Sequence, residues 1–337
     1  MSARVYLDWN ATAPLRPEAR AAMVAALEVA GNPSSVHAEG RAAKAVVERA
    51  REQVAAAVGC KAREVVFTSG ATEAAGVLAG FGAVTVERTA HDCLWAHRRG
   101  EGGVLALGLA NGETGVLSEV PEWDGPVLLD VVQAVGRVPF AFGWSGADFA
   151  VLSAHKLGGP KGVGALIIRE GVDILSLRPG GGQEMGRRSG TENVAGIAGF
   201  GAAAEAVVAD LADGVWNRVA ELRDGFEARI AAGAPDTIFV GKGAARLPNT
   251  SCLLTPGWKG ETQVMQMDLQ GFAVSAGSAC SSGKVRSSRV LGAMGYDERD
   301  AGSAIRVSIG PTTTEAELDR FAAAWLAAHD RHRARAA

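Results

Sequence analysis

The chain has few cysteines, few aromatic residues and no long block of like charges. Its four cysteines are Cys60, Cys93, Cys252 and Cys280, and their spacing lacks the close pairs that are typical of metal ligands. We therefore expect free thiols in a reducing compartment, with Cys60 and Cys252 in structural positions. The formal charge is −3, and only the His/Arg-rich end of the chain is mildly basic. Neither nucleic acid nor a membrane surface is expected as a main partner.

Long apolar runs are also absent from the sequence. It contains no stretch of about 18 apolar residues, and its N-terminal segment lacks the apolar core of a signal peptide. A cytoplasmic location is the expectation that follows. With 337 residues, 47% hydrophobic and 21% charged, the chain has the composition of a globular protein with about two domains.

What the sequence has in abundance is glycine, with 44 residues, and an alternation of helix and strand signals. Residues 40–59 form an amphipathic pattern that ends at Gly59, a residue typical of a helix C-terminus. A strand, a turn and a helix are predicted over 63–80, and two strands around a Gly/Pro turn over 147–170. This alternation favours an α/β domain with a mostly parallel sheet, which we place at residues 14–205.

The pattern changes after about residue 195. Two long helices are predicted over 193–211 and 214–233, and short strands follow them. Thr314 and Glu317 have the spacing of a capping box before a final helix. We therefore expect a smaller α+β domain, made of residues 1–13 and 206–337.

Polar residues follow the predicted strands of the first domain. Thr72 lies where "FTSGATEAAG" passes from strand to helix, a place where backbone N–H groups and a hydroxyl can bind phosphate, although an ordinary capped helix has the same pattern. Asp130 ends the apolar run "VLLD". In open α/β sheets the carboxyl ends of strands face the ligand crevice. Asp130 could hold a protonated ring nitrogen there, or cap the segment that follows.

Lys156, in "VLSAHKLGGPKG", follows another apolar run, with Ser153 and His155 beside it. A lone lysine at such a position is usually solvated surface, but a lysine can also form a Schiff base with an aldehyde cofactor. A Schiff-base lysine, a carboxylate for the pyridinium nitrogen and a phosphate cradle together are the pattern of a pyridoxal 5′-phosphate (PLP) site. Candidates for all three are present in this one chain.

Six blocks of the sequence together resemble the cysteine desulfurases, which are PLP enzymes of aminotransferase class V. In order, they are "YLDWNATAPLRPEA", "GNPSSVHAEGR", "VVFTSGATEA", "SAHKLGGPKGVGAL", "GGGQEMGRRSGTENVAGIAGFGAA" and "VSAGSACSSG". The blocks run from about Val5 to about Ala327, nearly the whole chain. The resemblance implies an α/β fold of the fold-type I PLP-dependent transferases, with a large domain on a mostly parallel central sheet and a small α+β C-terminal domain.

The resemblance also implies roles around the cofactor. Lys156 is expected to form the Schiff base, and His91 to stack on the cofactor ring and assist proton transfer. Asp130 is expected to pair with the pyridine nitrogen, and Gln133 to contact the ring hydroxyl. The residues implied to bind phosphate are Ala71, Thr72, Ser153 and His155, with Thr191 reaching the phosphate of the other subunit of a homodimer.

On the substrate side, Arg306 is expected to hold the carboxylate of L-cysteine, a task that suits the planar fork of arginine. Cys280 lies in "VSAGSACSSGK", whose small residues give a structural cysteine little to pack against. The resemblance implies that Cys280 takes the substrate sulfur as a persulfide and that L-alanine is released. A sulfur-acceptor protein then receives the sulfur for iron–sulfur cluster assembly or tRNA thiolation. Cys93, two residues after His91, is interpreted as structural.

The sequence departs from the family pattern in several places, two of which bear on the site. Only 20 positions separate His91 from Asn111, so a strand and a helix of the cofactor domain are expected to be missing. The segment "LANGETGVL" has Asn-Gly where the family commonly has Asn-Asn, so Asn111 either contacts cofactor and substrate or has lost that role to Gly112. Two rivals stay open: a related PLP enzyme, such as a selenocysteine lyase or an aminotransferase, and a low-activity binding or regulatory subunit of a sulfur-transfer complex.

Overall fold

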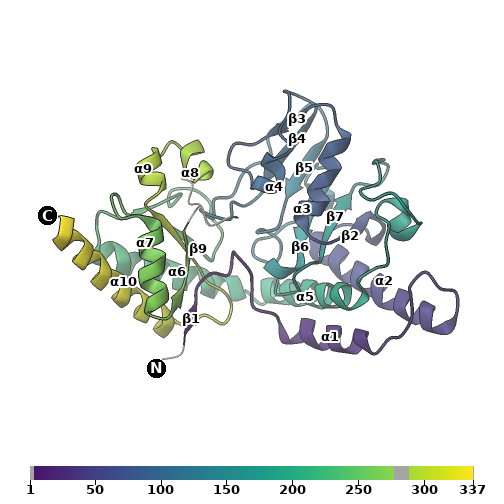
Figure 1. Cartoon of the computed structure of the whole chain (residues 1–337), viewed down its shortest axis with the longest axis horizontal. Coiled ribbons are helices and arrows are strands. Elements are labelled where there is room, and N and C mark those ends of the chain that lie inside the picture. The colour runs from purple at the N-terminus through teal and green to yellow at the C-terminus, as the bar shows by residue number, and fades with distance from the viewer. Residues whose placement is uncertain (1–3, 277–287, 337) are drawn as a thin grey trace. The chain divides into compact units, whose positions relative to one another are not determined.

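A computed structural model describes residues 4–276 and 288–336 of the chain (Figure 1). Its internal contacts divide the chain into two compact units. The large unit contains Thr12–Ala110 and Ser118–Asp213, and the small unit contains Met1–Ala11, Asn111–Leu117 and Gly214–Ala337. The domain boundaries predicted from the sequence, 14–205 and 1–13 with 206–337, remain a prediction.

The large unit is built on a six-stranded sheet with the strand order β2-β7-β6-β5-β4-β3. Strands β3 to β6 run parallel to one another, whereas β7 is antiparallel to both of its neighbours. The sheet is therefore mostly parallel, as predicted. The strands are β2 (Val65–Thr68), β3 (Val84–Val86), β4 (Val104–Gly108), β5 (Val127–Asp130), β6 (Phe149–Ser153) and β7 (Gly164–Ile168).

Both faces of this sheet are buried, because neighbouring residues of one strand join two different hydrophobic clusters. On β4, Leu105 and Leu107 belong to one cluster, while Val104 and Ala106 belong to the other. Strands covered on both faces read as continuous apolar runs instead of alternating ones, which is the pattern in this sequence.

Three long helices lie in the large unit: α1 (Pro17–Leu27), α2 (Ala38–Val58) and α5 (Val194–Ala212), and α5 packs against the other two. Helix α2 ends at Gly59 in the left-handed conformation (φ 70°), as predicted. Among the described helices, α5 alone is long and apolar enough to cross a membrane by composition. It packs against α1 and α2 inside the large unit.

The remaining helical segments of the large unit are short. The helix predicted at the end of the 63–80 segment exists only as one α-helical turn that continues as a 3₁₀ helix, consistent with the poor helix propensity of its glycines. The short segments are η1 (Ala62–Glu64), α3 (Ala71–Ala74), η2 (Ala75–Gly80), α4 (Asp92–Trp95), η3 (Phe142–Trp144), η4 (Ala154–Lys156) and η5 (Gln183–Gly186).

The small unit contains a four-stranded antiparallel sheet and a parallel pair of short strands. The sheet has the order β11-β12-β9-β8, with β8 (Ile238–Phe239), β9 (Thr250–Leu254), β11 (Ser275–Ala276) and β12 (Ala304–Ser308). The pair joins β1 (Val5–Tyr6) to β10 (Phe272–Ala273). The first residues of the chain are thereby held next to residues more than 260 positions away.

Five helices lie in the part of the small unit that the structure describes. The predicted capping box is confirmed: the Thr314 N–H donates to Glu317 Oε2 (2.9 Å), and the Glu317 N–H donates to Thr314 Oγ1 (3.3 Å). The helices are α6 (Val215–Gly233), α7 (Gly260–Leu269), α8 (Arg289–Ala293), α9 (Glu298–Ala301) and α10 (Glu315–Ala336). The small unit therefore has the α+β organisation expected from the sequence.

Candidate active site

The strand ends of the large unit bring several predicted site residues to one edge of the sheet. Strands β5 and β6 run parallel and end at Asp130 and Ser153, and η4 carries Lys156 directly after Ser153. The turn before Thr72 lies beside this edge, since a Cβ added at Gly70 would be 3.7 Å from Ser153 Oγ. The carboxylate, the lysine and the hydroxyl groups predicted from the sequence thus come from neighbouring strands.

Asp130 is a buried carboxylate, with only 9% of its surface exposed. Its Oδ1 accepts a hydrogen bond from the Val132 N–H (3.0 Å). Burial raises the pKa of Asp130, although His91, the Val132 N–H and Lys156 act in the opposite direction. Both interpretations of this residue are therefore compatible: one oxygen caps the following turn, and the buried charge favours a cationic ligand.

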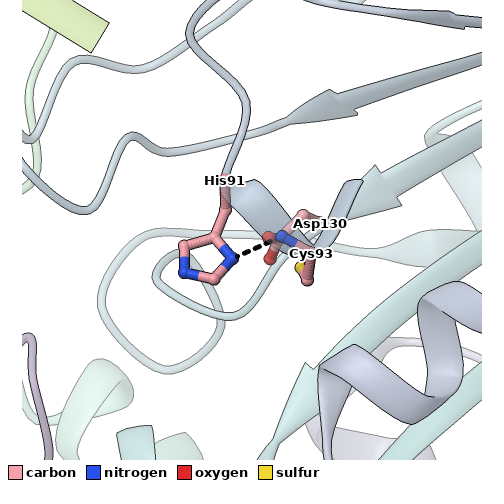
Figure 2. A group of neighbouring side chains, drawn as sticks. All are labelled: His91, Cys93 and Asp130. Atoms are coloured by element: carbon pink, nitrogen blue, oxygen red, sulfur yellow. Dashed lines mark hydrogen bonds between the residues drawn. The ribbon is translucent and has the colours of Figure 1, made fainter. Parts of the chain in front are cut away.

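His91 is the N-cap residue of α4, and its ring lies beside Asp130 (Figure 2). Its Nδ1 accepts a hydrogen bond from the Cys93 N–H (3.1 Å), so a neutral ring carries its proton on Nε2. One donor atom each of His91, Cys93 and Asp130 lies within 4.8 Å of the others. These are donor types that zinc accepts, but the lone pair on His91 Nδ1 is already used by the Cys93 N–H.

Cys93 is a buried thiol, and its burial is the main cause that raises its pKa above the usual range, with Asp130 adding to the effect. Burial likewise raises the pKa of Cys60 and of Cys252 to about 12 in each case. All three are free thiols that stay protonated near neutral pH. This state fits the structural interpretation of these residues.

Arg137 is a residue that the sequence patterns do not single out. Its Nη2 donates to the backbone oxygen of Lys156 (3.2 Å), and its Nη1 donates to Oε1 of Gln133. Only 4% of Arg137 is exposed. This buried guanidinium therefore fixes Gln133 relative to the backbone that carries Lys156.

His155 sits one residue before Lys156, and its Nδ1 lies 3.2 Å from Thr12 Oγ1. Burial lowers the pKa of His155 to about 4, and Lys156 and Lys161 act in the same direction. The imidazole is therefore neutral near pH 7, and one ring nitrogen can serve as an uncharged hydrogen-bond donor.

Thr191 is exposed and lies between η5 and α5. A buried ion pair holds the segment before it. Glu184 binds Arg51 through two hydrogen bonds (2.8 and 2.9 Å) and also accepts from the Phe67 N–H (2.9 Å), just before the turn to α3. Glu184 has a φ of 48°, an uncommon conformation outside glycine that these three contacts stabilise.

The two predicted substrate residues of the described chain lie in the small unit. Arg306, on β12, donates from Nη1 to the Gly112 oxygen (3.0 Å) and from Nη2 to Asp8 Oδ1 (2.7 Å). Asn111 Oδ1 accepts from the N–H groups of Glu113 and Thr114 (2.9 Å each), so its side-chain oxygen shapes this turn. Asp8 is a second residue that sequence reasoning missed. Cys280 lies outside the described residues.

The chain matches a described protein family and is similar to many known proteins in sequence and in structure. The sequence matches the family "Aminotransferase class-V" over residues 5–88 and 89–321. A cysteine desulfurase of Cereibacter sphaeroides is 39% identical, and the alignment covers 94% of each chain. A cysteine desulfurase IscS of Dictyoglomus turgidum is 36% identical, with 95% of this chain and 93% of the relative covered. A NifS-like protein from Rickettsia africae has a similar structure, with a TM-score of 0.89, 30% identity and coverage of 97% and 99%.

The chain therefore belongs to the aminotransferase class-V family. Within it, the relatives place the chain among the cysteine desulfurases, which confirms the resemblance found in the sequence and the fold class that it implied. The alignment with the Cereibacter protein is 366 positions long, whereas this chain has 337 residues. The relative thus carries segments that this chain lacks, in agreement with a shortened family member.

Proposed function

We propose that this chain is a PLP-dependent cysteine desulfurase that converts L-cysteine to L-alanine and takes the sulfur as a persulfide on Cys280. The observation that carries the proposal is the 39% identity to a cysteine desulfurase over 94% of both chains. The residue types at the strand ends of the large unit support it, since they are those that a PLP site needs.

The described residues fit the cofactor on chemical grounds. Asp130 is a buried carboxylate for which the effect of burial outweighs that of the neighbouring His91 and Lys156, and a protonated ring nitrogen would stabilise its charge further. Neutral His155 and the Ser153 hydroxyl would donate to the phosphate, with Ala71, Thr72 and the Thr191 of a second subunit. When bound, PLP supplies an electron sink for the carbanion that develops next to the substrate amine.

Each remaining role falls to a side chain of the protein. Lys156 would hold the cofactor covalently, and Gln133, fixed by Arg137, would contact the ring hydroxyl. His91 would stack on the ring, and its Nε2 would move protons, since Nδ1 is held by the Cys93 N–H.

The sulfur chemistry requires substrate orientation and a thiolate. Arg306 would hold the substrate carboxylate, and Asn111 would line the same region. The Cys280 thiolate would attack the substrate sulfur, so that a sulfur–sulfur bond forms while the bond between that sulfur and the substrate carbon breaks. The electron pair of the broken bond stays with the carbon, which takes a proton and leaves as L-alanine.

The working form would be a homodimer, because Thr191 is exposed on the surface of its own chain and would reach the phosphate of a second copy. Its location would be the cytoplasm, as expected from the sequence. The persulfide would then be passed to a sulfur-acceptor protein, for iron–sulfur cluster assembly or tRNA thiolation. Neither a membrane nor a nucleic acid has a part in this scheme.

The test is the release of L-alanine from L-cysteine by the PLP-loaded protein with a thiol reductant. The expected result is L-alanine formation by the wild type and a fall to background in Cys280→Ala, while Cys60→Ala, which removes another thiol, stays active. No L-alanine from any of them would contradict the proposal.

The shortened length of the chain favours one second candidate, a low-activity subunit that needs a partner. Adding a sulfur-acceptor protein to the same assay separates the two. L-alanine formation that appears only with the acceptor identifies the partner-dependent form, and a 2-oxo acid product instead of L-alanine identifies an aminotransferase.

A further inference from the structure

Asp8 reaches Arg306 through strand pairing at the start of the chain. Strand β1 pairs with β10 in a register that sets Val5 against Phe272 and Tyr6 against Ala273. Two residues further along both strands, Asp8 comes beside Ser275, whose Oγ donates to Asp8 Oδ2 (2.8 Å). Because Ser275 pairs with Arg306 across β11 and β12, the carboxylate arrives next to the guanidinium.

Two protein acceptors fix the outer nitrogens of that guanidinium. Nη2 donates to Asp8 Oδ1 (2.7 Å) and Nη1 donates to the Gly112 oxygen (3.0 Å). The Gly112 oxygen is itself held by Asn10 Nδ2 (3.1 Å). Only 13% of the Arg306 side chain and 17% of the Asp8 side chain are exposed. The plane of the guanidinium is thus set by two acceptors, and each acceptor is itself held: Asp8 by Ser275 and the Gly112 oxygen by Asn10.

The inner nitrogen of Arg306 is different. Among the described residues, Nε of Arg306 is a buried donor without a hydrogen-bond partner. Leaving a buried donor unpaired is unfavourable, and a ligand that accepts from it would remove that cost. A carboxylate that binds arginine side-on uses Nε together with Nη2, and each amino nitrogen of arginine has two hydrogens to donate.

We infer that Asp8 is a positioning residue for substrate recognition: with the Gly112 oxygen, it holds Arg306 so that the Nε edge receives the substrate carboxylate. This inference rests on the proposed function, which gives Arg306 the substrate carboxylate. Asp8 stays in place when substrate binds, because Ser275 holds its second oxygen and because Nη2 has a second hydrogen for the incoming group.

A competing role for Asp8 predicts the opposite change in substrate affinity when Asp8 is removed. If Asp8 occupied the site in place of the substrate carboxylate, its removal would strengthen substrate binding. If it positions Arg306, its removal frees the guanidinium to rotate, and the orientation must be restored on binding at a cost in affinity. The direction of the change in affinity therefore decides between the two.

The experiment compares Asp8→Ala with Asp8→Asn in the PLP-loaded full chain. Asp8→Ala is expected to raise the KM for L-cysteine about tenfold or more, with a much smaller change in kcat. Asp8→Asn keeps an oxygen acceptor for Nη2 and is expected to restore KM to within about threefold of the wild type. Ser275→Ala, which removes only the support of Asp8, should change KM in the same direction by less.

A second readout does not depend on turnover. Calorimetry measures the binding of L-alanine and of ethylamine, which lacks the carboxylate. We expect Asp8→Ala to weaken L-alanine binding and to leave ethylamine binding unchanged. An unchanged or tighter affinity for L-alanine would overturn the inference. Absence of L-alanine release by the wild type would instead count against the proposed function, and the calorimetry would still test Asp8.

Discussion

The two units of this molecule build their polar sites by different means. In the large unit, Asp130, Ser153 and Lys156 sit at or just after strand ends, and each takes its place from the strand that precedes it. In the small unit, Arg306 is oriented by Asp8 and by Gly112, which are 298 and 194 positions away. The first kind of site is visible in short stretches of sequence, and the second kind exists only after folding.

The largest expected effect tests whether single side chains carry the chemistry of the large unit. His91→Gln keeps a polar side chain but removes proton transfer through an imidazole, so kcat for L-alanine release should fall by about 10²- to 10⁴-fold. The matched control is His97→Gln, which changes another histidine of the same unit. Equal kcat values for the two variants would remove His91 from the mechanism.

The second prediction concerns the segment before Thr191. This segment differs from the strand-end residues of the large unit because an ion pair between distant residues, Arg51 and Glu184, holds it. Arg51→Met leaves Glu184 as a buried charge, and we expect the free energy of unfolding to fall by about 3–5 kcal/mol. Arg49→Met, at an exposed position of the same helix, is the control. Urea unfolding of both variants measures the difference.

A double variant sharpens this test. Glu184→Gln added to Arg51→Met removes the buried charge, so it should recover part of the lost stability if the unpaired carboxylate is the cause. If Arg51→Met unfolds at the same urea concentration as Arg49→Met, the ion pair does not stabilise the segment.

The smallest expected effect is the pH dependence of folding stability that is due to His155. Its pKa is lowered to about 4 in the folded chain, against 6.5 as the ordinary value. The unfolded chain therefore binds a proton that the folded chain does not, so this stability is present above pH 6.5 and is lost as the pH falls towards 4. His155→Gln should lose less of its melting temperature between pH 7 and pH 4.5 than the wild type. Parallel pH profiles would show that His155 does not contribute.

The contrast between the units also explains what the sequence could predict. The apolar runs before Asp130 and Lys156 predicted strands, and their last residues predicted ligand-facing side chains, because a strand's end is a local property. Gly59 and the Thr314–Glu317 box predicted helix ends for the same reason. The role of the Asn111 oxygen in its turn was not predicted, because an Asx turn depends on backbone geometry.

Contacts between distant segments could not be predicted from the sequence patterns. Nothing in "YLDWN" indicates that Asp8 meets Arg306, and nothing near Gln133 indicates that Arg137 also binds the Lys156 backbone. Strand registers between the two ends of the chain decide the first contact. The resemblance to the family named Arg306 without naming the carboxylate that orients it.

The pairing of β1 with β10 has a consequence for the order in which the protein is made. The large unit is complete once Asp213 has been synthesised, so it can fold while the ribosome is still translating. The first strand of the small unit, Val5–Tyr6, has to wait for Phe272–Ala273 before it finds its partner. During synthesis, Asp8 therefore emerges 298 residues before Arg306, the residue that it contacts in the folded chain.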